Sequence, residues 1–195
     1  MAPRTYQLQR RAETTDATRQ RIVEAAVAVY RKRGMSGATI QAIAERANVS
    51  RGTVVNHFGG TGGLLDAVLD RVVEELEYPD PRQLAGAVTL EDRIRRFVEV
   101  MFRFFGRGND WWEVFGAYQD VPELKAREQA YWGVLAGFQA AAFGELVNDK
   151  TFAAAVRAFV DYGPRNALLA SGLTVDEAID LVAGALIGIA RQRAG

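Results

Sequence analysis

The chain of 195 residues has no cysteine and only one histidine. Disulfides and thiol chemistry are therefore excluded, and no metal site of the zinc type is expected. Its longest apolar run, residues 181–190, is too short to cross a bilayer, and the first eleven residues lack the apolar centre of an export signal. These absences favour a protein of the cytoplasm with no metal, no cofactor and no membrane contact.

Catalytic motifs are missing as well. The single histidine, His57, has no partner set of the Ser/His/Asp kind in the sequence, and the glycine run at 59–63 lacks the Gly-Lys-Ser/Thr of a phosphate-binding loop. No alternating apolar and polar run of strand type occurs either. We therefore expect an all-α protein that is not an enzyme.

The net charge of zero conceals two different halves. Residues 1–58 carry ten Lys and Arg against four Asp and Glu, whereas residues 59–195 carry 14 against 20. A basic segment binds polyanions through counterion release, and an acidic body keeps the remaining surface off them. The arginines near the start form either a flexible arm along a nucleic-acid backbone or a solvated tail: Arg4, Arg10, Arg11, Arg19 and Arg21.

Residues 18–58 carry the pattern of three consecutive helices. The apolar residues from Ile22 to Tyr30 are spaced as on one face of an amphipathic helix. Gly34 is suited to the left-handed cap that would end this helix. Thr39 and Ser50 are N-cap residues for two short helices, and Asn48 between them tolerates a positive φ. Two helices joined by so short a turn form a helix-turn-helix, the second of which can enter a DNA groove.

The segment IAERANVSRGT at 43–53, followed by NHF at 56–58, closely resembles the N-terminal domain of the TetR family of bacterial transcriptional regulators. This resemblance implies that the third helix enters the major groove of a palindromic operator in double-stranded DNA. Threonine and serine at helix starts would bind phosphate, and Arg to guanine or Asn to adenine pairs would read bases. The residues so implied are Thr39, Ser50, Arg51, Gly52, Thr53, Val55, Asn56, His57 and Thr61.

Two positions depart from the family pattern. Val55 stands where relatives commonly carry a tyrosine, and Thr61 stands where they commonly carry a lysine. Both usual residues contact the DNA backbone, so three consequences are open: weaker DNA binding, a different sequence preference, or compensation by the arginine-rich N-terminal arm. Glycines around Thr61 also lower helix propensity, which predicts that the fourth helix begins late, near residue 64, and connects to the rest of the chain through residue 77.

The chain is expected to divide into a DNA-binding domain at 1–60 and a helical ligand-sensing and dimerisation domain at 61–195. Further helices are predicted from the capped start at Thr89 toward Gly108, at about 110–118, 122–147 and 150–171, and from the capping box at Thr174 to about 193. The pair at 163–164, Gly-Pro, is expected to kink the helix that contains it.

Aromatic side chains are dense in the middle of the second domain. Each is either ordinary core or part of a pocket for a small hydrophobic or amphiphilic effector, and the resemblance implies a ligand cavity here. Arg165 would orient a carboxylate or a lactone carbonyl of a ligand, or make a structural salt bridge. The candidate ligand residues are Phe104, Phe105, Trp111, Trp112, Phe115, Tyr118, Tyr131, Trp132, Phe138, Tyr162, Arg165 and Asn166.

The last helix carries an apolar face of Val182, Ala185, Leu186 and Ile189, with Gly184 and Gly188 allowing close approach of another helix. In a monomer this stripe would be buried against the chain itself. A homodimer is favoured because two recognition helices related by a twofold axis read a palindrome. The resemblance implies the same arrangement.

Two functions remain after an enzyme is set aside. The favoured one is a ligand-responsive transcriptional regulator, a repressor released from its operator by the effector. The alternative, motivated by Val55 and Thr61, is a small-molecule-binding or protein-binding module whose DNA binding is weakened or lost.

Overall fold

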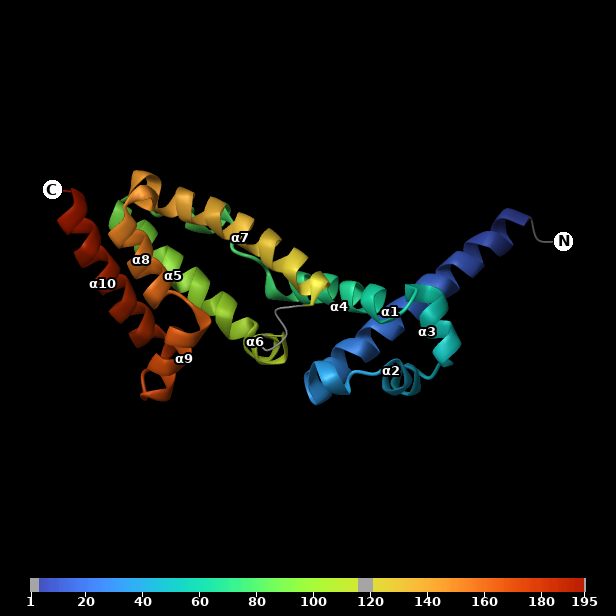
Figure 1. Cartoon of the computed structure of the whole chain (residues 1–195). Helices are drawn as coiled ribbons and strands as arrows, with labels where there is room; N and C mark the ends of the chain where they lie inside the picture. Colours follow the sequence, from blue (N-terminus) through green and yellow to red (C-terminus); the bar gives the residue numbers. More distant parts are fainter. Residues whose placement is uncertain (1–3, 116–120, 195) are drawn as a thin grey trace. The chain divides into compact units, whose positions relative to one another are not determined.

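The computed structural model describes residues 4–115 and 121–194, and every regular element within those ranges is a helix (Figure 1). The predicted all-α class is confirmed. The elements are α1 (Arg4–Gly37), α2 (Ile40–Ala47), α3 (Arg51–Phe58), α4 (Thr61–Leu76), the 3-10 helix η1 (Pro81–Leu84), α5 (Leu90–Arg107), α6 (Asn109–Phe115), α7 (Pro122–Phe143), the 3-10 helix η2 (Gly144–Asn148), α8 (Lys150–Phe159), α9 (Tyr162–Ala170) and α10 (Val175–Ala194).

The chain forms two compact units. Unit 1 contains residues 1–75 and 113–125, and unit 2 contains residues 76–112 and 126–195. The sequence predicted a boundary at residue 60, whereas the contacts place α4 up to Glu75 in unit 1 together with a later segment of the chain. That later segment was not foreseen, because contacts distant in sequence leave no periodic signal in a single chain.

Unit 1 is built around the apolar stripe of α1. Ile22 and Ala26 are fully buried, and α2 packs on α1 through Ile43 and Ala44. Gly34 has φ 67° and ψ −177°, which interrupts α1 at the residue predicted to end it. The helix extends back to Arg4, so the predicted flexible arm is helical from there onward.

The fourth helix begins earlier than its glycines suggested. Residue Thr61 starts α4, and both Gly62 and Gly63 are inside the helix. Leu64 donates its backbone N–H to the carbonyl of Gly60 at 3.2 Å, so the first helical turn is closed despite the low propensity of glycine. Burial of the apolar residues that follow, among them Leu64, Leu65 and Val68, stabilises the helix and offsets the low propensity of the glycines.

Unit 2 has an aromatic core centred on α5. Phe97, Phe102 and Phe104 of this helix are fully buried, as are Phe138 of α7 and Phe152 of α8. The C-terminal helix α10 packs against α5 and α8 (Figure 1).

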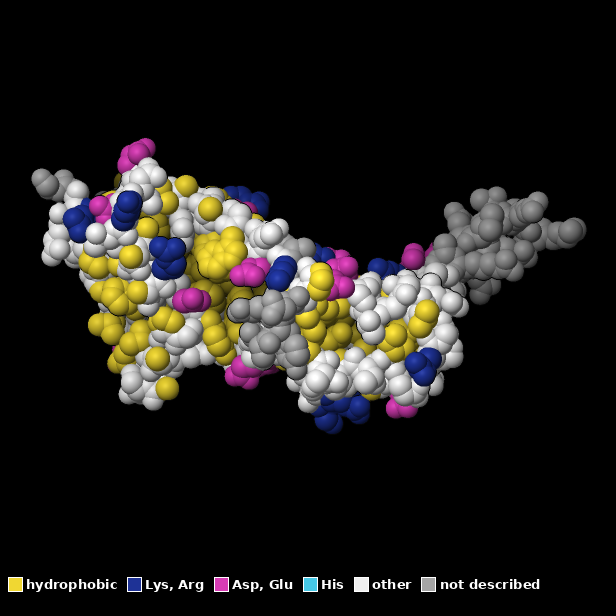
Figure 2. All heavy atoms as spheres, viewed as in Figure 1, with side chains coloured by type: hydrophobic (Ala, Val, Ile, Leu, Met, Phe, Trp, Pro, Cys, Tyr) yellow, Lys and Arg dark blue, Asp and Glu magenta, His cyan; other side chains and the backbone are white. Residues whose placement is uncertain are grey.

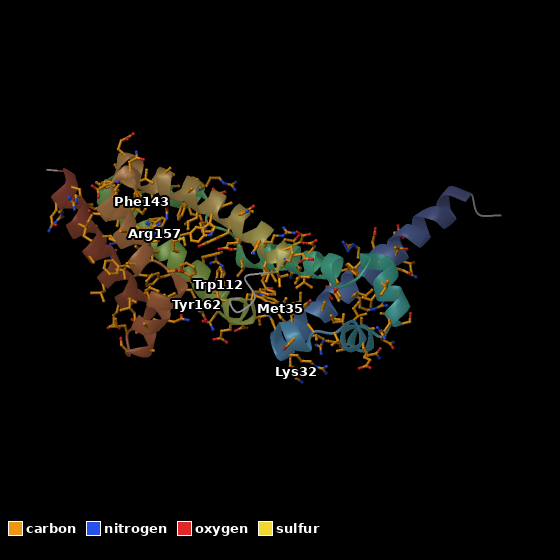
Figure 3. The ribbon with its side chains drawn as sticks, in the orientation of Figure 1. Lys32, Met35, Trp112, Phe143, Arg157 and Tyr162 are labelled. Carbon is orange, nitrogen blue, oxygen red and sulfur yellow. The ribbon has the colours of Figure 1, made fainter. Side chains whose placement is uncertain are left out.

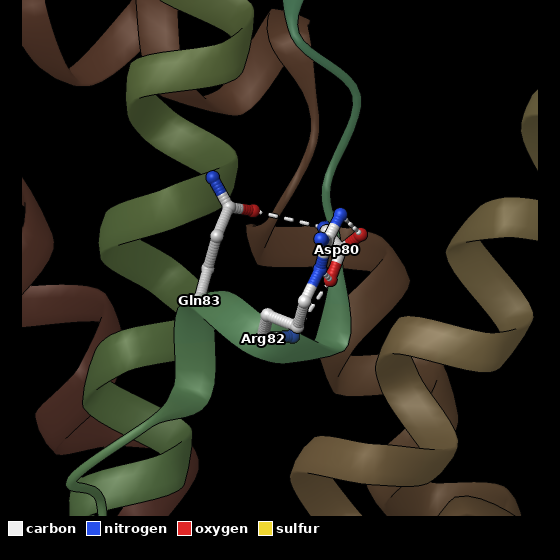
Figure 4. A network of polar contacts seen from close by, with 3 residues as sticks. All are labelled: Asp80, Arg82 and Gln83. Carbon is white, nitrogen blue, oxygen red and sulfur yellow. Dashed lines mark hydrogen bonds and ion pairs between the residues drawn. The ribbon is translucent and has the colours of Figure 1, made fainter.

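Side-chain caps fix the starts of the helices in unit 2. Asp80 accepts from the backbone N–H of Arg82 at 2.7 Å, and the side chain of Gln83 accepts from the backbone N–H of Asp80 at 2.8 Å (Figure 4). Both predicted capping residues are confirmed, since Thr89 caps α5 with Asp92 and Thr174 forms a capping box with Glu177 at the start of α10. These caps satisfy N–H groups that have no partner within their helix.

The helix predicted at about 150–171 is wrong in one respect, because it is two helices. It stops at Phe159, and Asp161 starts α9 with φ −145° and ψ 169°. Pro164 therefore lies in the first turn of α9, where a missing N–H costs nothing. The expected kink at Gly163-Pro164 is replaced by a complete break three residues earlier.

Candidate functional site

The turn between α2 and α3 has the geometry that the sequence indicated. Asn48 adopts the left-handed conformation at φ 52° and ψ 51°. Its N–H donates to the carbonyl of Glu45 at 3.2 Å, and the N–H of Val49 donates to that of Ala44 at 3.0 Å. These two bonds form a Schellman motif, which ends α2 and turns the chain at once into α3. The predicted helix-turn-helix is confirmed.

Two hydroxyl groups cap the helices of this motif. Thr39 Oγ1 accepts from the N–H of Ala42 at 3.2 Å, and Ser50 Oγ accepts from the N–H of Thr53 at 3.0 Å. Ser50 Oγ also lies 2.9 Å from Thr53 Oγ1. Both caps are exposed, so their hydroxyls and the free N–H groups beside them are open to an anion such as phosphate.

One face of α3 is open to solvent. Val54 and Phe58 are buried and attach the helix to unit 1. The residues on the open face are Arg51, Gly52, Val55 and Asn56, which are exposed, and Thr53 and His57, which are half-buried. A short helix with one buried and one polar open face can enter a DNA groove without unfolding.

Two arginines that were assigned to the N-terminal arm have structural contacts instead. The guanidinium of Arg19 lies 4.5 Å from the centre of the Phe58 ring, a cation–π contact that holds the end of α3. Arg21 Nε donates to the carbonyl of Ala47 at 3.0 Å, at the end of α2. These contacts position the helix-turn-helix on α1, and no local pattern around either arginine predicts them.

Thr61 occupies the first position of α4 and is exposed. It is separate from the open face of α3 in sequence but belongs to the same unit. Because α4 presents unpaired N–H groups at its start, Thr61 is placed to contact an anion there.

A cluster of aromatic rings in unit 2 has Trp112 at its centre. The Trp112 ring lies 5.8 Å from that of Phe105, 5.9 Å from Phe104, 6.2 Å from Tyr131 and 6.1 Å from Tyr162. Figure 3 shows Trp112 and Tyr162 next to each other. Phe104 and Phe105 are buried, whereas the other three rings are half-buried. We call these five residues the Trp112 cluster.

Burial in the Trp112 cluster changes the acidity of Tyr131. Burial raises the pKa of Tyr131, and the charge of Asp161 raises it further. Tyr131 therefore stays a neutral hydrogen-bond donor at all physiological pH values.

Arg165 and Asn166 lie beside this cluster on α9. Arg165 is 8% exposed and its Nη1 donates to Asn166 Oδ1 at 2.9 Å, while Asn166 Nδ2 donates to Asn109 Oδ1 at 3.3 Å. Among the described residues no carboxylate forms a salt bridge with Arg165, which excludes one of its two predicted roles there. Burial lowers the pKa of the guanidinium, and Tyr162 opposes this effect.

Other predicted ligand residues lie elsewhere. Phe138 stacks on Phe97 at 5.1 Å in the core, and Phe115 belongs to unit 1, 6.3 Å from Tyr30. Trp111 is buried, and Trp132 is 50% exposed beside a groove of about 220 Å³ between α7 and α8. Tyr118 lies outside the described residues.

The face of α10 that points outward matches the predicted one only in part. Leu186 is fully buried within unit 2, where the helix packs on α5 and α8, whereas Val182 is buried but lines a hollow on the outward side. Of the predicted set, Ala185 is exposed and Ile189 half-buried. The outward apolar surface contains Leu181, 55% exposed, and Phe159, which line a hollow of about 520 Å³ with Pro164, Leu168 and Ala185. Figure 2 shows hydrophobic side chains at the end of unit 2 that contains α9 and α10.

Comparison with known proteins identifies the helix-turn-helix. Residues 22–68 match the family model described as bacterial regulatory proteins, tetR family. This segment is a TetR-family domain. It contains α2, α3 and the start of α4, including every predicted DNA-binding residue.

Curated relatives match part of the chain. The HTH-type transcriptional regulator BetI of Burkholderia thailandensis is 40% identical over 78 residues, which cover 40% of this chain and 36% of the relative. BetI of Burkholderia ambifaria is 35% identical over 94 residues, covering 48% of this chain and 44% of the relative. The matches thus span less than half the length of these relatives.

Solved structures extend the likeness to the whole fold. The multidrug binding protein EbrR, complexed with imidazole, is similar over 87% of each chain, with a TM-score of 0.61 and 24% identity. A TetR-like transcriptional regulator from Rhodococcus sp. RHA1 covers 91% of this chain and 96% of its own, with a TM-score of 0.61 and 20% identity. At such low identity the likeness concerns the fold, which pairs a TetR-type domain with a helical second domain.

No helix within the described ranges is long and apolar enough to cross a membrane. Nor do residues 4–115 and 121–194 contain a group of three or more His, Asp or Glu side chains arranged for a metal ion.

Proposed function

We propose that the chain is a dimeric, ligand-responsive regulator that reads a palindromic operator with α3. The observation that carries this proposal is the open face of α3, where Arg51, Thr53 and Asn56 project from a helix fixed to unit 1 by Val54 and Phe58. An Arg to guanine or Asn to adenine pair contributes about 1–3 kcal/mol of discrimination. Relatives named as transcriptional regulators support the same function.

Contacts to the DNA backbone would position this helix. Thr39 and Ser50 hold exposed hydroxyls at helix starts, where the helix dipole favours phosphate. His57 and Thr61 are the further candidates at the end of α3 and the start of α4. Such contacts give affinity without sequence preference, and the base contacts of α3 then select the site.

A second copy of the chain supplies the second recognition helix. One α3 of eight residues reads few base pairs, whereas two copies read half-sites about 34–36 Å apart or a multiple of that spacing. The outward surface of Leu181, Ala185 and Phe159 is the candidate dimer surface, with the exposed Gly184 and Gly188 allowing close approach. Val182 lines the same hollow and so belongs to this surface, whereas Leu186 is fully buried.

Release by an effector follows from two states of the dimer. A hydrophobic or amphiphilic small molecule bound in unit 2 would favour the state in which the two α3 helices no longer match both half-sites. To lower operator affinity a hundredfold, the effector must bind that state about 2.7 kcal/mol more tightly than the DNA-binding state. Helix α4, which ends at Leu76 where unit 2 begins, is the candidate connector.

Selection from random-sequence DNA with the purified chain tests this function. At about 150 mM salt the recovered sequences should contain an inverted repeat. Substitution of Asn56 by Ala should relax the preference at one position in each half-site, while Asn148→Ala, on η2 in unit 2, serves as the matched control and should leave it unchanged. Recovery of no common sequence would favour the alternative, a binding module that has lost DNA recognition.

A further inference from the structure

Arg165 is the one charged side chain that is buried among the described residues. Within the described part of the chain, its Nε–H is buried without a hydrogen-bond partner, and its Nη1 donates to the neutral oxygen of Asn166. Burial of a cation without an anionic partner is strongly unfavourable, so proteins seldom retain one unless something binds it. The side chain is therefore satisfied only in part by the chain itself.

A second buried donor lies beside the same helix end. Trp112 Nε1–H also has no partner among the described residues. A Cβ at Gly106 would lie 2.7 Å from Arg165 Nη2, and a Cβ at Gly108 would lie 2.7 Å from Trp112 Nε1. The two donors thus pack against glycines two positions apart at the C-terminal end of α5, where a side chain at either glycine would collide with a donor.

The surroundings of these donors are aromatic. Trp112 contacts Phe104, Phe105, Tyr131 and Tyr162, the residues of the Trp112 cluster. Such a wall binds apolar groups, whereas a planar guanidinium matches the two oxygens of a carboxylate. The combination of two unsatisfied N–H donors and an apolar wall fits a molecule with one anionic end and one apolar end.

We propose that the effector of this chain is an amphiphilic carboxylate. Arg165 and Trp112 Nε1–H bind its carboxylate, and the Trp112 cluster binds its apolar part. The inference rests on the proposed function, because it specifies the chemical class of the effector that the regulator senses. Of the two roles predicted for Arg165, the proposal selects the binding of a ligand over a structural salt bridge.

Binding of decanoate to the full chain, followed by tryptophan fluorescence and thermal unfolding, tests the site without DNA. Decan-1-ol and decyltrimethylammonium keep the apolar part and change the head group. Decanoate should bind about 10- to 100-fold more tightly than either, since a hydrogen bond to a charged group contributes about 1.5–3 kcal/mol. Equal binding of the three compounds, or no binding of decanoate, would overturn the proposal.

Two variants locate the carboxylate. Arg165→Gln should lose most of the preference for decanoate over decan-1-ol, and Arg157→Gln should retain it. Arg157 is the matched control, because it is an exposed arginine on α8 that lines the separate groove beside Trp132. Loss of the preference in Arg157→Gln alone would place the anion in that groove and overturn the assignment.

A purely structural role of Arg165 has a different signature. If the guanidinium only packs against the carbonyl end of α5, Arg165→Met should lower the melting temperature of the ligand-free chain. The proposal expects an unchanged or higher melting temperature, because the substitution removes an unpaired buried charge. Trp112→Phe keeps an aromatic ring without the N–H, and it should weaken decanoate binding several-fold while decan-1-ol binding changes little.

The site and the proposed function fail in different ways. Decanoate binding that depends on Arg165, in a chain that selects no DNA sequence, would leave the site standing and remove the regulator. Release of selected DNA by a neutral or cationic compound, unaffected by Arg165→Gln, would leave the regulator standing and remove the carboxylate.

Discussion

Gly63 lies so close to Phe58 that a Cβ at position 63 would be 2.1 Å from the Phe58 carbonyl oxygen. Phe58 is the last residue of the candidate recognition helix, and Gly63 is in the first turn of α4. The two helices therefore approach each other through backbone alone. This contact gives the glycine run a structural purpose that helix propensity alone does not suggest.

Substitution of Gly63 by Ala should destabilise unit 1 by about 1–3 kcal/mol, the usual cost of forcing a group into packed structure. Gly62→Ala is the matched control, because its Cβ meets only the carboxylate end of Glu123, which can move. Replacing that glycine should raise stability by up to about 1 kcal/mol through helix propensity. Urea unfolding measures both free energies, and equal effects of the two substitutions would argue against the close approach.

Asn48 should tolerate glycine but not other residues. Its left-handed backbone costs an ordinary residue about 1–2 kcal/mol, and glycine nothing. Asn48→Gly should therefore keep the stability of the chain, while Asn48→Ala should lose about 1 kcal/mol of it, as measured by urea unfolding. A stable Asn48→Ala variant would mean that the turn does not need this conformation.

The Asp80 carboxylate, which caps η1, should stabilise the fold less in acid than at neutral pH. Hydrogen bonds from the side chain and the backbone N–H of Arg82 lower the pKa of Asp80 to about 2, from 3.8. Because the pKa is lowered in the folded state, Asp80 stabilises the fold fully above about pH 4, and this contribution is lost as the pH falls toward 2. Asp80→Asn should therefore lower the melting temperature at pH 7 more than at pH 2, whereas an equal effect at both pH values would exclude the ionised cap.

Restoring the lysine that the family commonly has at Thr61 should strengthen DNA binding at every sequence. Thr61→Lys should increase the dependence of log affinity on log salt by about one, the release of one counterion. Thr151→Lys, an exposed threonine on α8 in unit 2, adds the same charge away from the candidate interface and should leave the slope unchanged. Identical slopes for both variants and the original chain would place Thr61 away from DNA.

Local chemistry was readable from the sequence, and contacts between distant segments were not. Thr39, Asn48 and Ser50 were predictable because a cap or turn depends on the residue itself and its near neighbours. The contacts of Arg19 and Arg21 were missed, because each joins α1 to residues more than twenty positions away.

The second domain shows the same division. An apolar stripe on α10 was evident, but Leu186 is fully buried within unit 2, where α10 packs on α5 and α8, since periodicity shows that a face is buried and does not show by what. Aromatic density likewise predicted a cluster without its centre, Trp112. That Arg165 is buried without an anionic partner among the described residues follows only from its three-dimensional surroundings.

The most direct test of the central claim is the affinity of the chain for selected DNA and for scrambled DNA of equal composition. At about 150 mM salt, we expect selected DNA to bind at least about a thousandfold more tightly. Arg51→Ala with Asn56→Ala should remove most of this ratio, while affinity for scrambled DNA falls less. Equal affinity of the original chain for both DNAs would contradict sequence reading by α3.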